Sequence, residues 1–356
     1  MKFEAATIKD IGKALGLSAS TVSRALRDSY EISAETKNLV LEYAKKINFQ
    51  RNPIALSLRK KRSRTIGVIV AEIANSFFSQ VIHGIESEAH KYGYNVIIAQ
   101  TLESYEQEVS TMHSLASRSV DGCLVSVSAE TKDVTHFSNL YDKGFPLVFF
   151  DRIVESINTH KVMADTFQGA YDATMHLLEN RFSRIAVLAT NDKLSITKQR
   201  LAGYTKALQD WGCPFDEALI KYCTYGGMQY NEVDEAIDDL LSANDKPDAI
   251  FALSDKLTTG CVRYCQAHDI VIPEELGLTG FSNLDLTELL SPSLSVVRQP
   301  ALEMGKTAAA LLIKMIEAKR PFTEFENLLL PTELLKRQSS TRKGRLFATK
   351  RVKQFA

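Results

Sequence analysis

The sequence predicts a small all-α head joined to a larger α/β body of two doubly wound, parallel-sheet subdomains. Two observations predict this division. Three short helical patterns, each with its own capping residue, occupy roughly the first fifty residues, whereas short apolar runs alternate with helical patterns from Thr65 onward. At 356 residues the chain is also longer than one hydrophobic core usually supports. We therefore expect at least two compact units.

The head begins with a helix that is capped at both ends. Thr7 can accept a hydrogen bond from the first turn, while the Asp10 side chain reaches back to the Thr7 amide. Gly16 ends this helix because a tight turn favours a residue that tolerates positive φ. Hydroxyl caps at Ser18 and Ser33 predict a second and a third helix. Their expected buried faces are Val22, Ala25 and Leu26 in the second and Leu39, Val40, Tyr43, Ala44 and Ile47 in the third.

Two short helices joined by a glycine turn are the helix-turn-helix plan, in which the second helix enters the DNA major groove. The expected DNA-contacting residues on that helix are small or hydroxylic except for one: Ala19, Ser20, Thr21, Ser23 and Arg24. Arg24 can make the two hydrogen bonds that a guanine edge offers. The pattern alone also fits a three-helix module whose serine and threonine residues only cap helices.

The charge distribution favours the DNA-binding interpretation. Residues 1–65 hold 14 Lys and Arg against 6 Asp and Glu, a net charge of +8. Residues 66–335 hold 21 against 37, a net of −16, and residues 336–356 hold 8 against none. A basic head on an acidic body is expected when one end of a protein meets a polyanion. The basic segment 339–356 has no apolar period and is expected to be a disordered tail.

A short apolar helix is predicted at Asn52–Arg59, between head and body. Asn52 can cap it and is also expected to contact DNA, and Pro53 suits its first position. Such a helix is too short to be stable alone. Because basic residues flank it on both sides, we expect it to order against DNA, with an apolar side chain inserted in the minor groove.

The body alternates strands and helices. Strands are predicted at Ile66–Val70, Asn95–Ala99, Gly122–Val127, Leu147–Phe150, Lys161–Ala164, Ile185–Ala189, Ile250–Leu253, Leu278–Phe281 and Leu294–Val297. Helices are predicted at Phe78–Tyr92, Glu106–Arg118, Val134–Lys143, Lys198–Trp211, Asn231–Leu241, Lys256–His268 and Ala301–Ala318. Continuous apolar strands of this kind are typical of parallel sheets covered on both faces. The pattern does not determine to which subdomain the last strand and helix belong.

Several separated motifs resemble the LacI/GalR family of bacterial regulators: Thr-Ile-Lys-Asp-Ile-Gly, Ser-Thr-Val-Ser-Arg-Ala-Leu, Ser-Ala-Glu-Thr and Ala-Leu-Ser-Leu, in that order. The resemblance implies minor-groove contacts by Ala55 and Leu58, with Arg59 beside them, and an effector domain related in fold to periplasmic sugar-binding proteins. The family usually has proline where this chain has Arg51, so the start of the hinge is shifted. The resemblance covers roughly residues 5–338.

The resemblance also implies the domain boundaries. A helix-turn-helix domain at 1–50 is followed by a hinge helix and linker at 51–64 and a ligand-binding and dimerisation domain at 65–338. The N-subdomain is expected at about 65–163 and 295–325, and the C-subdomain at about 164–294 and 326–338.

An effector is expected between the subdomains, where strands end. The expected contact residues are Phe77, Phe78, Asp151, Ser195, Arg200, Met228, Asp255 and Ser282. Adjacent Phe77 and Phe78 are not expected to face one core together, so at least one is predicted to be an aromatic platform. Arg200 and Asp255 match cleft residues of the family. Met228 could equally belong to the core.

Two departures from the family bear on the effector. Ser282 stands where many relatives carry an aspartate, and the segment 193–197 lacks the arginine of purine-binding relatives. Both weaken a nucleobase interpretation and favour a sugar.

The main alternative is a sugar-metabolising enzyme with a basic N-terminal extension. Against it, the sequence contains no Gly-x-Gly-x-x-Gly, Walker or Gly-x-Ser-x-Gly motif. No cofactor and no metal site are expected, and the five scattered cysteines are expected to be free, buried thiols. A pure sugar-binding protein would need an export signal, which the sequence lacks; we therefore expect a cytoplasmic protein with no membrane partner. One helix-turn-helix contacts half a site, so we expect a homodimer or a higher oligomer on a double-stranded DNA operator.

Overall fold

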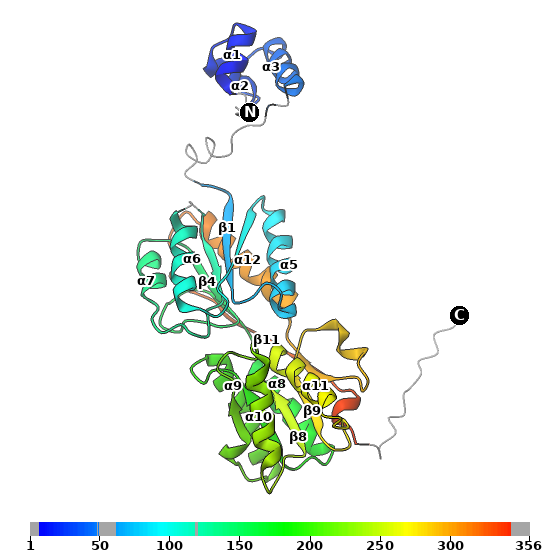
Figure 1. Cartoon of the computed structure of the whole chain (residues 1–356). Helices are drawn as coiled ribbons and strands as arrows, with labels where there is room; N and C mark the ends of the chain where they lie inside the picture. The colour runs from blue at the N-terminus through cyan, green and yellow to red at the C-terminus, as the bar shows by residue number, and fades with distance from the viewer. Residues whose placement is uncertain (1–6, 48, 50–61, 118–119, 343–356) are drawn as a thin grey trace, which may run out of the picture. The chain divides into compact units, whose positions relative to one another are not determined.

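The computed structural model describes residues 7–47, 49, 62–117 and 120–342. The chain divides into two compact units, Met1–Ser63 and Arg64–Ala356. Figure 1 shows the helices and strands of both units. The first contains only helices among its described residues, whereas the second alternates strands and helices.

The head consists of α1 (Ile8–Leu15), α2 (Ala19–Ala25) and α3 (Ala34–Lys46). The predicted capping box is present: the Thr7 hydroxyl accepts from the Asp10 amide at 3.3 Å, and the Asp10 carboxylate accepts from the Thr7 amide at 2.8 Å. Gly16 ends α1 at φ 67°, the left-handed region that glycine favours. Ser18 and Ser33 cap the next two helices as predicted.

One small core joins the three helices of the head, built from Ile11, Val22, Ala25, Val40 and Ala44. The turn between α1 and α2 lies very close to α1, because a Cβ on Gly12 would come within 2.6 Å of the Leu17 carbonyl oxygen. The prediction that Leu39 lies on the buried face of α3 is wrong, since 47% of it is exposed. The core-facing side of α3 is centred on Val40 and Ala44, and Leu39 lies about 100° around the helix from Val40.

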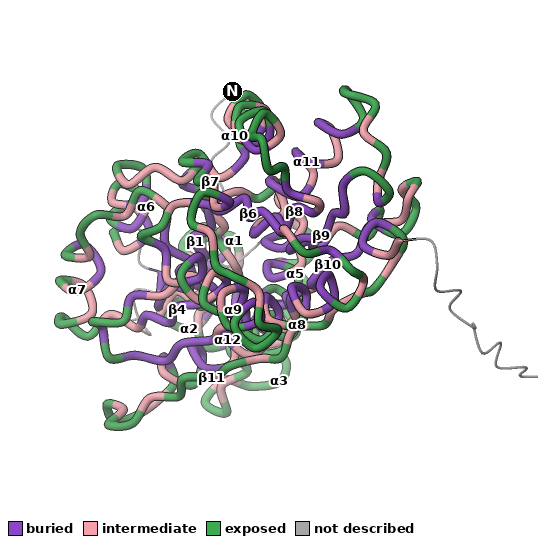
Figure 2. The backbone as a smooth tube through the Cα atoms, turned by 90° about the horizontal axis from the view of Figure 1, so that it is seen from below, coloured by how far each residue is buried: buried purple, intermediate pink, exposed green. Residues whose placement is uncertain are grey.

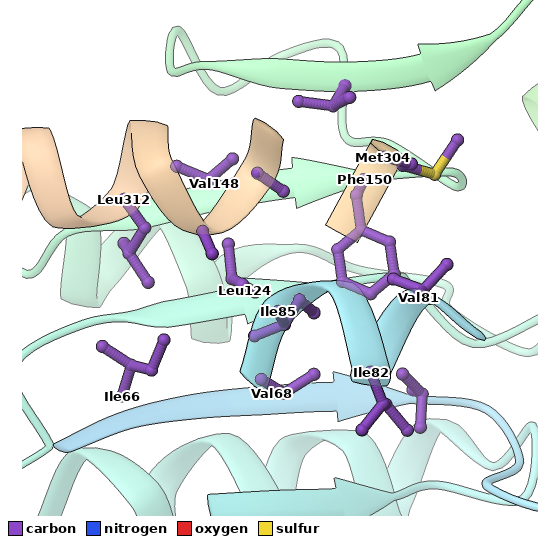
Figure 3. Packing of buried hydrophobic residues seen from close by; sticks show 14 of the residues in the cluster. Ile66, Val68, Val81, Ile82, Ile85, Leu124, Val148, Phe150, Met304 and Leu312 are labelled. Atoms are coloured by element: carbon purple, nitrogen blue, oxygen red, sulfur yellow. The ribbon is translucent and has the colours of Figure 1, made fainter. Parts of the chain in front are cut away.

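The first sheet of the body is fully parallel, with strand order β11-β5-β4-β3-β1-β2. Its strands are β1 (Thr65–Val70), β2 (Asn95–Gln100), β3 (Cys123–Val125), β4 (Leu147–Phe150), β5 (Lys161–Ala164) and β11 (Asn327–Leu330). Helices α5 (Ser76–Lys91) and α12 (Ala301–Glu317) pack on one face. Helices α6 (Tyr105–Ser117) and α7 (Thr135–Tyr141) cover the other. Figure 3 shows Val81, Ile85 and Met304 of the first helix pair with Val68 and Leu124 of the strands.

The second sheet has the order β12-β10-β9-β8-β6-β7, and only the pairing of β12 with β10 is antiparallel. Its strands are β6 (Ile185–Ala189), β7 (Ile220–Tyr222), β8 (Ala249–Ala252), β9 (Gly277–Phe281), β10 (Ser295–Arg298) and β12 (Glu333–Leu335). Helices α8 (Thr166–Glu179) and α9 (Ser195–Trp211) cover one face, and α10 (Tyr230–Ser242) and α11 (Asp255–Ala267) the other. Short 3-10 helices η1 (Glu217–Leu219), η2 (Asp285–Glu288) and η3 (Gln338–Ser340) complete this half. The predicted fold class is confirmed.

The strand pairing differs from the expected subdomain boundaries in two places. Ser295–Arg298 was expected in the N-subdomain, but this strand pairs with β9 of the second sheet. Asn327–Leu330 was expected in the C-subdomain, but it pairs with β5 of the first sheet. A strand of four residues carries no local signal that favours one sheet over the other, so the pairing is decided by the tertiary structure. Helix α8 had no predicted counterpart.

The expectation that the disordered tail begins at residue 339 is wrong for Ser339 and Ser340, which belong to η3. Ser339 and Ser340 are fully buried, and the Ser340 hydroxyl lies 2.6 Å from the Ser295 hydroxyl and 2.7 Å from His176 Nε2. Polar side chains of this kind can be ordered when each finds a buried partner. Residues 343–356 lie outside the described part of the chain.

Burial follows the sheet order. Figure 2 shows the central strands of the body as mostly buried. The outermost strands β2 and β7 contain no fully buried residue, whereas every residue of β3, β4, β6, β8 and β9 is buried. Among the described residues, no helix combines the length and the apolar character that a membrane span requires.

Candidate functional site

Helix α2 carries the five residues that the sequence predicts to face DNA. Ala19, Ser20 and Arg24 are exposed, and Thr21 and Ser23 are half-buried. The Ser18 hydroxyl lies 2.7 Å from that of Ser20 and 2.8 Å from that of Thr21. A hydroxyl group both donates and accepts, so these side chains keep hydrogen-bonding capacity toward a phosphate or a base edge.

Two arginines of the head make contacts around this helix. Arg24 Nη1 lies 3.1 Å from Glu31 Oε2, and the two side chains are 53% and 45% exposed. Arg27 donates to the Ser23 carbonyl at 3.0 Å and to the Ser23 hydroxyl at 2.6 Å. Arg24 is therefore an exposed side chain in a surface ion pair, and such pairs contribute little to stability.

The hinge residues Asn52, Ala55, Leu58 and Arg59 lie outside the described part of the chain. Their expected role in the minor groove stays a prediction.

A cavity lies between the two subdomains of the body, and we call it the inner cavity. It is lined by Ala71, Glu72, Asn75, Phe78, Glu103, Ala129 and Arg152 from the first subdomain and by Thr190, Asn191, Leu194, Thr224, Tyr225, Gly226, Met228, Ser254 and Lys256 from the second. Nearly all of these residues follow strand ends or begin helices. Phe78 and Met228 are the expected contact residues that line it.

Two ion pairs face the inner cavity. Arg152 donates to both Glu103 oxygens, at 2.6 Å and 2.9 Å, within the first subdomain. Burial acts to raise the pKa of Glu103, but the charge and hydrogen bonds of Arg152 outweigh it and hold that pKa below its usual value. Across the cleft, Lys256 Nζ lies 3.1 Å from Glu72 Oε1. None of these four residues was among the expected effector contacts, although all follow predicted strands.

The expectation that Phe77 and Phe78 do not face one core together is wrong. Phe77 and Phe78 are 6% and 5% exposed and belong to the same core cluster, with their rings edge to face at 5.2 Å. Both fit because they lie in the first turn of α5, after the Asn75 cap, where the helix end meets both the core and the cleft. Phe78 alone of the two lines the inner cavity.

Asp151 and Arg200 come from different subdomains and are joined through Gln299. Gln299 donates to Asp151 at 3.4 Å and accepts from Arg200 at 3.2 Å. Arg200 also donates to the Leu253 carbonyl and lies over the Phe281 ring, 3.9 Å from its centroid. All three bridged residues are buried.

Burial dominates the electrostatics of this pair. It raises the pKa of Asp151 and lowers that of Arg200 to about 10, although each charge favours the other. Asp151 also adopts φ 57°, which is unusual for a residue other than glycine and places its side chain at the end of β4. The two expected contact residues are therefore close together, but Gln299 lies between them.

Two further expected contact residues, Asp255 and Ser282, are hydrogen-bonded to each other within the C-subdomain. The Ser282 hydroxyl donates to Asp255 Oδ1 at 2.5 Å. Burial raises the pKa of Asp255, and the Ser282 hydrogen bond opposes that shift. Neither residue lines the inner cavity.

A second cavity, the outer cavity, adjoins the first. It is lined by Val127, Ser128, Ala129, Thr131, Val134, Arg152, Ile153, Val154, Glu155, Ser156, Lys193, Leu194 and Ser195. Ser195 was expected before the helix predicted at Lys198–Trp211, but it is the first residue of α9. It lines the outer cavity only.

Within the described part of the chain, no group of three His, Cys, Asp or Glu side chains could hold a metal ion. The cysteines are free, and all but Cys213 are buried. Burial raises the pKa of the Cys123 and Cys223 thiols to about 12, so neither is a reactive thiolate at neutral pH.

Comparison with family models matches both units of the chain. Residues 7–52 match the model of bacterial regulatory proteins of the lacI family. Residues 63–338 match the model of periplasmic binding proteins and the sugar-binding domain of the LacI family.

Individual relatives agree with this match. The HTH-type transcriptional repressor PurR of Vibrio atlanticus is 31% identical over 314 residues, which span 88% of this chain and 93% of the relative. The regulator CelR, solved as a cellobiose complex, is 26% identical with a TM-score of 0.70, covering 94% of this chain and 99% of that one.

Two further solved structures share the fold. A LacI family regulator from Enterococcus faecium with bound ribose is 28% identical with a TM-score of 0.68, covering 78% and 98% of the two chains. The operator-bound lac repressor dimer is 21% identical with a TM-score of 0.80, covering 95% and 100%, and this likeness concerns the fold alone. The enzyme alternative is excluded because the matched models and relatives are regulators. The chain belongs to the lacI family of bacterial regulatory proteins, as a DNA-binding transcriptional repressor with an effector-binding domain.

Proposed function

We propose that this repressor binds a palindromic operator as a homodimer in the cytoplasm, and that a sugar bound between its two subdomains controls its affinity for DNA. The observation that carries the proposal is the cleft itself: a cavity lined from both subdomains, with its charged groups paired and an aromatic ring at its edge. A ligand there contacts both halves of the body, so it can favour one relative arrangement over another.

The DNA half of the proposal rests on α2. Ser20 and Thr21 would contact phosphates at the start of the helix, and Arg24 would contact a guanine edge. Ala19 and Ser23 are small enough to let the helix enter the groove. Asn52, Ala55, Leu58 and Arg59 would add minor-groove contacts from the hinge.

The effector half rests on the polar groups of the cleft. Asp151, Arg200, Asp255 and Ser282 would bind hydroxyl groups, with Phe78 as an apolar surface for a sugar ring. Gln299 already fills the hydrogen-bonding capacity between Asp151 and Arg200, so a bound hydroxyl would replace it or join the bridge. Phe77 would support Phe78, while Ser195 and Met228 would lie at opposite ends of the bound ligand. Two relatives were solved with sugars, cellobiose and ribose, which supports this ligand class.

Selection of binding sites from random duplexes, followed by gel shifts on the selected palindrome, tests DNA recognition. Arg24→Ala should weaken specific binding by about 1–3 kcal/mol, because a lost bidentate guanine contact has that magnitude. Arg320→Ala is the matched control, an exposed arginine of the body. Equal affinities of the Arg24 variant and the control would contradict the assignment.

Thermal-shift screening of the full chain tests the effector. Monosaccharides, disaccharides and the nucleobases guanine and hypoxanthine are compared at the same concentrations. Stabilisation by a sugar, lost in Arg200→Ala, would support the proposal, whereas stabilisation by a nucleobase alone would overturn the sugar assignment. Leu58→Ala should weaken operator binding without changing the sugar-induced shift.

A further inference from the structure

The inner and outer cavities are adjacent compartments of one cleft. They share three lining residues, Ala129, Arg152 and Leu194. The inner cavity continues toward Phe78 and Met228, whereas the outer cavity is formed by the segments after β3 and β4 and by the start of α9. Arg152 therefore lies at the junction of the two compartments.

The two compartments differ in size. The inner cavity has a volume of about 60 Å³, which is room for about two water molecules. The outer cavity has a volume of about 330 Å³, within the usual range of about 300–1,000 Å³ for small-molecule sites. A ligand of sugar size cannot be confined to the inner cavity as it stands, and the larger free volume lies beyond Arg152.

The charges of the cleft favour a neutral ligand. The guanidinium of Arg152 is balanced by Glu103, and the Lys256 ammonium by Glu72. The rim of the outer cavity adds one exposed residue of each sign, Lys193 and Glu155. In the inner cavity, a phosphorylated or acidic sugar would have to break one of these ion pairs to reach a cation, and at the rim Glu155 balances the charge of Lys193.

The lining of the outer cavity combines apolar and hydroxyl side chains. Val127, Val134 and Ile153 provide apolar surface, while Ser156 and Ser195 provide hydroxyls. A saccharide ring presents both apolar C–H faces and hydroxyl edges, so it matches such a lining. Ligand pockets in general are lined mostly by apolar side chains with a few polar groups among them.

We propose that the cleft takes a neutral saccharide of two linked rings, one in the inner cavity and one in the outer, with Arg152 in contact with both. This inference rests on the proposed sugar effector. The inner ring enters when the cross-cleft contacts of Lys256 with Glu72 and of Asn191 with the Ala129 carbonyl open. The outer ring occupies space that is already formed.

Calorimetric titration of the full chain tests the inference with matched sugars. The probes are glucose with maltose and cellobiose, galactose with lactose, mannose with mannobiose, and xylose with xylobiose. At least one disaccharide should bind about tenfold or more tightly than its own monosaccharide, equivalent to about 1.4 kcal/mol from the second ring. If a monosaccharide binds as tightly as its disaccharide, the two-ring inference is wrong and the sugar effector stands. If no sugar binds, both fail.

A blocking variant assigns the second ring to the outer cavity. Ser156→Trp fills that cavity with an indole ring and should weaken the disaccharide about tenfold, while the affinity for the monosaccharide changes much less. Ser242→Trp, at the end of α10, is the matched control, because Ser242 is exposed and lines neither cavity. Lys193→Trp, on the opposite wall, repeats the test if Ser156→Trp does not fold. Equal losses for both sugars would place the second ring elsewhere.

Discussion

The two subdomains of the body share one plan, but the chain completes them differently. Their sheet orders, β11-β5-β4-β3-β1-β2 and β12-β10-β9-β8-β6-β7, correspond strand for strand. The first subdomain is completed by α12 and β11, which come from far along the chain, whereas the second has its helix pair α8 and α9 close together in sequence. The helix pair α5 and α12 and the helix pair α8 and α9 nevertheless both pack with their backbones in close approach. The contact is therefore a property of the fold and not of chain proximity.

Glycines make these close approaches possible. A Cβ on Gly305 of α12 would lie 2.1 Å from the Val81 carbonyl oxygen of α5, and one on Gly84 would lie 2.2 Å from the Leu302 oxygen. In the second subdomain, a Cβ on Gly203 of α9 would lie 2.2 Å from the Phe167 oxygen of α8. Backbone atoms cannot rotate away, so any other residue must push the helices apart.

In each subdomain, a buried histidine also forms a hydrogen bond with a segment near the C-terminal end of the described chain. His160 Nδ1 accepts from the Glu326 amide at 2.9 Å, immediately before β11. His176 Nε2 lies 2.7 Å from the Ser340 hydroxyl of η3. Burial lowers the pKa of both histidines, that of His176 to about 4. Both are therefore neutral in the folded protein at neutral pH.

The largest effect is expected when a methyl group is added at the glycines where α5 meets α12 and where α8 meets α9. Gly305→Ala and Gly203→Ala should each lower the free energy of unfolding by about 3 kcal/mol, the upper part of the range for overpacking. Without a close approach, alanine would instead stabilise a helix by about 0.5–1 kcal/mol, so the sign of the change decides. Denaturant unfolding measures it.

Gly260→Ala in α11 is the matched control, because the three atoms nearest to its added Cβ would be Val233 side-chain atoms, at 3.0 Å or more. Its effect should be smaller than those of the other two. A large difference between Gly305→Ala and Gly203→Ala would break the equivalence of the two helix pairs.

Acid should weaken both subdomains in the same direction. The folded-state pKa of His176, about 4, lies below its ordinary value of 6.5, so the unfolded chain binds the proton first. Stability is therefore unaffected above pH 6.5 and falls as the pH drops toward 4, by about 2 kcal/mol between pH 7 and pH 5. Unfolding at a series of pH values, for the original chain and for His176→Asn, measures this. The variant should show a flatter profile, and parallel profiles would refute the assignment.

The link between the subdomains should have a smaller effect. Gln299→Met removes the amide between Asp151 and Arg200 and should lower stability by about 1–2 kcal/mol, because two hydrogen bonds of about 0.5–1.5 kcal/mol each are lost. Hydrogen exchange should increase at Leu253 and Asp151 on both sides of the cleft. An increase confined to one subdomain would show that Gln299 does not couple them.

The smallest expected effect concerns the head. Glu31→Gln removes the partner of Arg24 and one negative charge beside the predicted DNA-contacting helix, so operator affinity should rise a few-fold. The gain should shrink at high salt, which gel shifts at two salt concentrations would show. Glu42→Gln, on the exposed side of α3, is the control.

The sequence alone determined most of the local structure. Helix starts at Thr7, Ser18 and Ser33 follow from caps that act within three residues. Strands Leu147–Phe150 and Ile185–Ala189 were predicted with their observed bounds, because buried parallel strands are continuous apolar runs. The family resemblance added the cleft and its position between the subdomains.

Only the tertiary structure decided which distant segments meet. The Gln299 bridge, the Lys256–Glu72 contact and the membership of β10 and β11 join residues that lie far apart in the chain. Local patterns depend on caps and side-chain periodicity, which act over a few residues, whereas these contacts join residues that only the folded chain brings together. For this reason the sequence predicted a cleft with Asp151 and Arg200 nearby, and the fold alone placed Gln299 between them.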